Sequence, residues 1–338
     1  MWFELLKKIN LNRNFIRVFL KNAYKFSIMM LFILAYIKIF GDENTLIGVS
    51  IYVGLAMFPV CDSNMKRSSM VLVIAIVFIG SGLVSQLDAL SPWISFPINF
   101  LFVYLVMMMT SEPTYLKLNI VMLLPFLFCQ SVPVSLEQFP IRMLAIFSGI
   151  FLMILATYFG WKKRGFGSED SKSFRQQLSL NKKHYKTGIR MATGISIAIL
   201  VSSILKTEKV LWITLVVMSL TQINSEEMLS RIKYRILGTV LGSIFFFLAF
   251  EYLLGREYAI FIVLLFGFIG FFSDEYKHKQ FINTVSAINA SLILFNTKNA
   301  IWNRFAGLAL GIAIVLILYF IEKLMVKKFT LVREESTV

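Results

Sequence analysis

Twelve apolar segments, separated by short polar or charged stretches, fill most of this 338-residue chain. They cover about 26–39, 44–60, 69–87, 92–110, 116–133 and 140–161, and then 188–205, 210–223, 235–254, 257–273, 280–296 and 301–325. A helix needs about 20 apolar residues to cross the hydrocarbon core of a bilayer. With 57% hydrophobic and only 16% charged residues, a soluble fold of this size has too little polar surface. The sequence therefore predicts an all-α, polytopic membrane protein with about 12 transmembrane helices.

Charged residues and glycines at the ends of these segments occur twice, at a nearly constant offset. Lys25, Asp62 and Lys66 recur 165 residues later as Arg190, Glu227 and Arg231. Glu112 recurs as Glu275, and the pair Arg142 and Gly149 recurs as Arg304 and Gly311. Charges next to spans are costly, so their recurrence in register indicates two copies of one unit. The organisation predicted is an amphipathic interfacial segment 1–25, a first six-helix repeat 26–161, a cytoplasmic linker 162–187, a second six-helix repeat 188–325 and a cytoplasmic tail 326–338.

The distribution of basic residues predicts the orientation. If residues 1–25 are cytoplasmic, the inner side holds 27 of the 34 lysines and arginines, against 7 on the outer side. The acidic residues divide 12 to 7, so the whole net charge of +15 lies on the inner side. This pattern places both termini in the cytoplasm and explains the basic character of the chain without nucleic acid. An even number of spans in each repeat makes the repeats parallel, with an axis along the membrane normal.

The sharpest local motif is Arg235-Ile-Leu-Gly238-Thr239-Val-Leu-Gly242, which enters the ninth segment from the cytoplasmic side. Its spacing places Arg235, Gly238, Thr239 and Gly242 on one helix face. The glycines would let another helix approach, and Thr239 can form a hydrogen bond across the contact. Two interpretations remain open: a helix-packing seam capped by a topology-setting arginine, or a pathway mouth where Arg235 attracts an anion.

This motif, after a short basic loop in a six-span unit, resembles the fusaric acid resistance (FUSC) or aromatic acid exporter superfamily. The resemblance runs from about Tyr185 to Gly255, with a weaker echo from Tyr24 to Gln86 that lacks the Gly-Thr-x-x-Gly pattern. The chain has no large soluble region after its spans, and so is most similar to compact members of the DUF2955-like group. The resemblance implies a multi-pass component of the cell inner membrane that exports small organic anions, is driven by the proton-motive force and works with a periplasmic membrane-fusion adaptor. It further implies an outer-membrane channel as a possible partner, and a homo-oligomer is compatible with it.

Several further polar residues are candidates for the pathway, each with a structural alternative. The candidates for binding a substrate carboxylate or guiding an anion are Lys25, Arg190, Arg142 and Arg304; the alternatives are snorkelling and interfacial anchoring. The eleventh segment carries the candidates Asn283, Ser286 and Asn289, and Ser286, Asn289 and Asn296 lie close to one stripe, so we expect a polar strip that faces protein or a cavity; the alternative is hydrogen bonding between helices. Asp62 and Lys66, matched by Glu227 and Arg231, are candidates for coupling or gating through exchanging ion pairs; the alternative is a solvated loop. No acidic residue falls near the middle of a predicted span.

Other functions are less well supported by the sequence. The chain has no P-loop motif, and neither its two cysteines nor its two histidines show metal-ligand or catalytic spacing, so we predict no enzyme activity, no metal site and no cofactor. His184 and His278 are expected to be solvated loop residues. The alternatives to an exporter are a polytopic enzyme acting on lipid-linked substrates and a non-transporting scaffold of an envelope complex. The expected partners are membrane lipids and the adaptor, with no nucleic acid.

Overall fold

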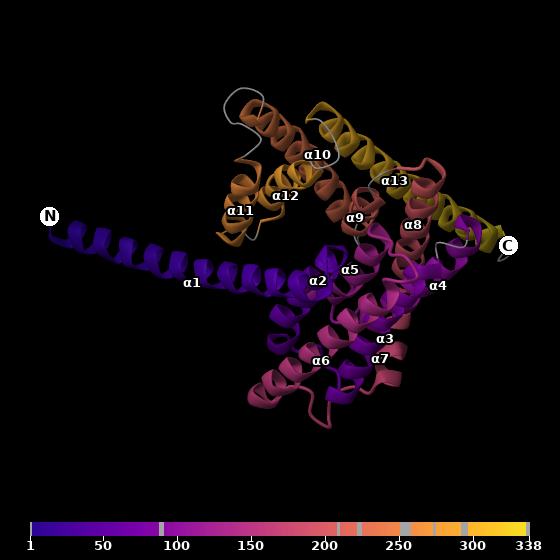
Figure 1. The fold of residues 1–338 in the computed structure, drawn as a ribbon. Coiled ribbons are helices and arrows are strands. Elements are labelled where there is room, and N and C mark those ends of the chain that lie inside the picture. The colour runs from indigo at the N-terminus through magenta and orange to yellow at the C-terminus, as the bar shows by residue number, and fades with distance from the viewer. Residues whose placement is uncertain are drawn as a thin grey trace. The chain divides into compact units, whose positions relative to one another are not determined.

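The computed structural model describes residues 2–87, 91–207, 210–221, 225–250, 258–272, 275–291 and 297–335, and nearly all of them are helical (Figure 1). The first half contains α1 (Trp2–Phe40), α2 (Thr45–Met57), α3 (Arg67–Leu87), α4 (Pro92–Thr110), α5 (Leu118–Ser131) and α6 (Phe139–Arg164). A short helix, α7 (Phe174–Asn181), lies in the linker. The second half contains α8 (Tyr185–Ile204), α9 (Val210–Leu220), α10 (Ser225–Leu248), α11 (Ala259–Ile269), α12 (Tyr276–Ser291) and α13 (Thr297–Glu335). Each of the twelve predicted apolar segments coincides with one of these helices.

Length and composition make this a multi-pass membrane protein. Within the described ranges, seven helical stretches are long and apolar enough to cross a bilayer: Phe15–Phe40, Asp42–Val60, Arg67–Leu87, Pro92–Thr110, Phe139–Arg164, Phe174–Ile204 and Lys298–Leu324. Three shorter apolar helices accompany them, at Leu118–Ser131, Val210–Leu220 and Ile260–Phe272. The all-helical membrane fold is thus confirmed, whereas twelve crossings in two parallel repeats remain a prediction.

Two predicted boundaries fall inside continuous helices. Helix α1 runs without interruption past residue 25, and its apolar span begins at Phe15. It ends at Gly41, whose φ of +86° is a conformation that favours glycine. At the other end of the chain, α13 continues from Thr297 through residue 325 to Glu335. Both continuations have the same cause, since neither boundary carries a glycine or proline that would end a helix.

The linker is more ordered than a simple connection. Helix α6 ends at Arg164, followed by Gly165 with a φ of +74°. Helix α7 then begins at a capping box, in which the Ser173 backbone donates to Gln176 Oε1 at 2.8 Å and the Gln176 backbone donates to Ser173 Oγ at 3.4 Å. The linker is therefore connected to the second half by a short helix whose N-terminus is fixed by a capping box.

The chain forms two compact units that differ from the two sequence repeats. The smaller unit comprises residues 1–35 and 229–305, and the larger unit comprises residues 36–228 and 306–338. In the larger unit, α2, α3, α5 and α6 pack on one another, α4 packs along α8, and α8 packs on α9. Two glycines predicted as repeat markers lie at close helix contacts there: Gly149 faces Ile51 of α2, and Gly311 faces Val216 of α9.

Contacts within the larger unit join segments that the charge distribution places on the same side of the membrane. On the predicted outer side, the Gln138 amide donates to Glu43 Oε1 at 2.7 Å. On the predicted inner side, Met65 pairs with Lys172 through the backbone. This pairing of loops is the arrangement expected when successive helices alternate in direction.

Candidate functional site

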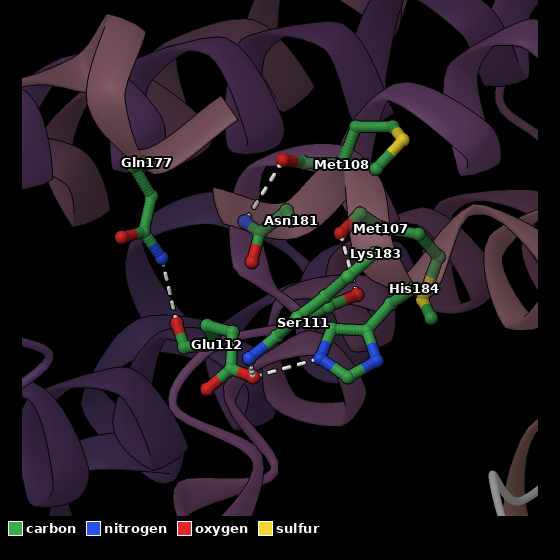
Figure 2. Close-up of polar contacts among 8 residues, drawn as sticks. All are labelled: Met107, Met108, Ser111, Glu112, Gln177, Asn181, Lys183 and His184. Carbon is green, nitrogen blue, oxygen red and sulfur yellow. Dashed lines mark hydrogen bonds and ion pairs between the residues drawn. The ribbon is translucent and has the colours of Figure 1, made fainter. Parts of the chain in front are cut away.

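The linker docks on the C-terminal end of α4 in the larger unit (Figure 2). The Asn181 amide donates to the Met108 carbonyl at 2.9 Å, and the Gln177 amide donates to the Glu112 carbonyl at 2.7 Å. Both amide side chains are buried. They satisfy carbonyl groups that the end of a helix leaves without intrahelical partners. The linker is thus attached to the body of the larger unit at defined points.

The Glu112 carboxylate binds two residues from the end of the linker. Its Oε1 lies 2.7 Å from His184 Nε2 and 2.7 Å from Lys183 Nζ, and Figure 2 shows both side chains converging on it. Partial burial acts to raise the pKa of this carboxyl, but the hydrogen bonds and charges of Lys183 and His184 outweigh burial and lower the pKa below its ordinary value. With only 14% of the His184 side chain exposed, the prediction that His184 is a solvated loop residue is wrong.

A cavity of about 270 Å³ lies beside this cluster. Its lining includes polar side chains from the α4–α5 connection, from α8 and from the region of α9 and α10, namely Ser111, Thr114, Tyr115, Lys117, Asn119, His184, Thr187, Thr221 and Glu227. Lys117 and Glu227 form an ion pair across it at 2.9 Å. Both side chains are more than 40% exposed, so the pair contributes about 0.2–1 kcal/mol. Glu227, predicted as a coupling or gating residue, therefore lies at the wall of a real cavity.

The predicted motif of α10 forms a close contact with α12 in the smaller unit. A Cβ placed on Gly238 would lie 2.7 Å from Gln280 Cβ, and one placed on Gly242 would lie 2.9 Å from Thr284 Cβ. Thr239 Oγ1 lies 3.5 Å from Thr284 Oγ1. The absence of side chains at Gly238 and Gly242 is what allows the two helices to approach.

Two arginines are buried in the same smaller unit. Arg235 on α10 and Arg304 on α13 are each 5% exposed, and their positive charges lie close enough to act on one another. Buried polar side chains from α10 and α12 accompany them: Thr239, Ser243, Gln280, Thr284 and Asn289. Two like charges and five polar groups inside membrane helices form an environment suited to a group of negative charge.

The predicted polar strip on α12 is only partly directed inward. Asn289 is buried, Ser286 is half-buried and Asn283 is exposed. The third member of the strip, Asn296, lies outside the described residues, and Asn283 is a separate candidate on the same segment. Of the strip, Asn289 is therefore the residue that belongs with the buried polar groups of the smaller unit.

Arg142, the repeat counterpart of Arg304, has a different environment. It is 1% exposed in the larger unit, and its guanidinium donates to Asn44 Oδ1 at 3.1 Å, to the Glu43 carbonyl at 2.8 Å and to the Val132 carbonyl. All three nitrogens thus bind protein oxygens. This geometry ties the start of α2 and the end of α5 to α6, and favours a structural role over the predicted role in guiding an anion.

The remaining candidates have partners of other kinds or are exposed. Arg190 binds Glu322 at 2.9 Å in the larger unit. The Asp62 carboxylate accepts from the Asn64 backbone at 2.8 Å within its own loop, and the Lys66 backbone donates to the Lys172 carbonyl of the linker. Two more candidates belong to the smaller unit, where the Arg231 guanidinium lies 4.7 Å above the ring of Tyr276 and Lys25 is exposed on α1.

Comparison with known proteins finds a family model that matches part of the chain. Residues 197–318 match the family model described as fusaric acid resistance protein-like. No curated protein and no solved structure matches the chain. The matched segment extends from within α8 to within α13, and so contains Arg235, Arg304 and the close contact of α10 with α12. Over this segment, about a third of the chain, the protein is similar to fusaric acid resistance protein-like membrane proteins, the resemblance that its Arg-x-x-Gly-Thr-x-x-Gly motif predicted.

Proposed function

We propose that this protein is an efflux transporter that exports small organic anions, with aromatic carboxylates as the preferred class. The observation that carries the proposal is the burial of Arg235 and Arg304 together, within the segment that matches the family. Two guanidinium groups inside apolar helices are costly to maintain. An anionic substrate that binds beside them would bring a negative charge to this pair of positive charges during transport.

The chemistry of these groups favours a carboxylate. A guanidinium offers paired N–H donors in a planar fork, which match the two oxygens of a carboxylate. Thr239 and Asn289 supply further neutral hydrogen-bonding groups nearby in the same unit. Because arginine keeps its charge over the physiological range, such a site discriminates by the charge of the substrate.

The aromatic preference rests on the residues that follow Arg235 along α10. Phe246 shares a helix face with Arg235, Thr239 and Gly242, and belongs to an apolar cluster with Phe250, Phe266 and Ile282. The ring of Phe266 also lies 5.2 Å from that of Phe245 and 5.9 Å from that of Phe281. A planar aromatic ring would pack beside this cluster, while its carboxylate would bind Arg304, which follows the cluster residue Ala300 by one turn of α13.

Energy coupling and partners extend the same proposal. The proton-motive force would drive export, with Glu227 and Asp62 as the proton-exchanging carboxylates. Glu227 is the better placed, because it lies at the wall of a cavity on the predicted cytoplasmic side. The protein would act in the cell inner membrane with a periplasmic membrane-fusion adaptor and an outer-membrane channel.

The test is export of a panel of radiolabelled organic acids from cells, with and without a protonophore. Wild-type protein is expected to export aromatic acids, and Arg235→Gln and Arg304→Gln are expected to abolish export at equal membrane abundance. Arg175→Gln, which removes an exposed arginine of the linker, serves as the control and should export normally. Normal export by both buried-arginine variants would remove the anion site from the proposal, and export unaffected by the protonophore would remove the proton coupling.

An enzyme acting on lipid-linked substrates is a second candidate, favoured by one observation. Glu112 and His184 form a carboxylate–histidine pair beside a polar cavity, on the predicted cytoplasmic side. In the described ranges no three His, Cys, Asp or Glu side chains group as metal ligands. If Glu112→Gln leaves aromatic-acid export intact but abolishes turnover of a lipid-linked substrate, the enzyme is the better account.

A further inference from the structure

A basic groove lies along the N-terminal helix in the smaller unit. Its volume is about 530 Å³, within the range of small-ligand sites, and its lining consists of Val18, Lys21, Asn22, Lys25, Gly267, Gly270, Phe271, Phe272 and Lys279. Lys21 and Lys25 stand one turn apart on α1, and Lys279 comes from α12. The described lining thus carries three ammonium groups.

The groove is part of a defined contact between α1 and the end of α11. The buried Asn22 side chain donates to the Phe271 carbonyl at 3.2 Å. The ring of Phe268 lies 5.3 Å from that of Phe19 and 5.7 Å from that of Phe26. These contacts fix the two lysines of α1 above one side of the groove. Gly267 and Gly270 line the other side of the groove.

The position of the groove favours a ligand from the membrane. Lys21 and Lys25 lie toward the predicted cytoplasmic end of the first span, and the connection after the tenth segment belongs to the same predicted side, where basic grooves between helices bind anionic lipids. Phe271 and Phe272 give the groove an apolar portion beside its lysines. This combination matches a phospholipid, whose phosphate would bind the ammonium groups while its glycerol and upper acyl carbons contact the rings.

We propose that this groove binds the phosphate headgroup of an anionic phospholipid from the inner leaflet. Lys277 and Glu275, which precede Lys279 in the chain, form an ion pair at 2.8 Å, so together they change the net charge near the groove very little. The lipid would hold α1 against α11, and therefore the start of the chain against the rest of the smaller unit. This site is separate from the proposed substrate site, and its occupancy does not depend on transport.

The experiment measures lipid binding to the full-length protein, purified in a neutral detergent. Short-chain phosphatidylglycerol is titrated, with short-chain phosphatidylcholine and inorganic phosphate as separate arms, and binding is followed by native mass spectrometry. We expect saturable binding of phosphatidylglycerol, and a loss of affinity on the order of tenfold or more in Lys21→Gln/Lys25→Gln/Lys279→Gln. The matched control is Lys162→Gln/Lys163→Gln/Lys186→Gln, which removes three exposed lysines of the linker and the start of α8 and should bind normally.

Three results would overturn the proposal. Equal binding of phosphatidylcholine would show that negative charge is not recognised, and equal binding of inorganic phosphate would assign the groove to a soluble anion. An equal loss in both triple variants would show a general effect of net charge. If the first triple variant fails to fold, Lys21→Gln and Lys279→Gln are tested singly, and unchanged affinity in both would refute the site.

Discussion

Replacing Arg142 by methionine should unfold the larger unit more easily, whatever its effect on transport. The side chain is 1% exposed, and its guanidinium donates to Asn44 Oδ1 and to the Glu43 and Val132 carbonyls. Methionine fills much of the same volume but donates to none of them. Leaving buried acceptor oxygens without their donor costs about 1–3 kcal/mol, and three such acceptors place this case at the upper end.

The assay is reversible denaturation in mixed micelles, which gives the free energy of unfolding of wild type and variant. Arg142→Lys is the informative companion, because it keeps the positive charge but cannot donate to three oxygens in a fixed fork. We expect Arg142→Lys to recover only part of the loss. If Arg142→Met is as stable as wild type and yet transports nothing, Arg142 acts in the pathway and the structural interpretation is refuted.

Three other variants test separate parts of the structure. Gly242→Leu should separate α10 from α12, because even a Cβ would lie 2.9 Å from Thr284 Cβ; we expect about 1–3 kcal/mol of destabilisation in the same denaturation assay, and an unchanged stability would contradict the close contact. Glu112→Gln should release the linker, at a cost of about 1–3 kcal/mol, and make linker proteolysis faster. Since the pKa of Glu112 is lowered by folding, its stabilising effect should be complete above the ordinary carboxyl pKa and disappear as the pH falls through the lowered value, and a linker equally protected in acid would oppose this. In a cysteine-free background, Asp170→Cys should be labelled only from the cytoplasm and Glu137→Cys only from outside; the reverse pattern would overturn the predicted orientation.

The elements of the fold were predictable because they depend on local pattern. Apolar runs bounded by charged residues located every helix of the two halves, and the glycines of the α10 motif were correctly read as allowing a close helix approach. The linker helix was predictable too, since Ser173 and Gln176 have the spacing of a capping box. The docking of this helix on the end of α4 was not predictable, because it depends on contacts with residues far away in the chain.

The environment of each charged residue was not predictable from the sequence. Arg142 and Arg304 both precede a glycine by seven residues, and nothing local separates them. In the structure, Arg142 binds oxygens at the start of α2 and the end of α5, while Arg304 is buried in the smaller unit, which also holds the buried Arg235. Likewise His184 and Glu112, separated by 72 residues, meet only because the linker folds back on α4. Such long-range pairs depend on tertiary packing, which a single sequence does not specify by pattern.

The central claim is that Arg235 and Arg304 recognise the negative charge of an exported aromatic acid. The most direct measurement compares export of an aromatic acid with export of its neutral amide, in cells with wild-type protein or Arg304→Gln at equal abundance. The account predicts that wild type strongly prefers the acid, and that Arg304→Gln loses this preference while still inserting and folding. An Arg304→Gln protein that keeps the full preference for the acid would contradict it.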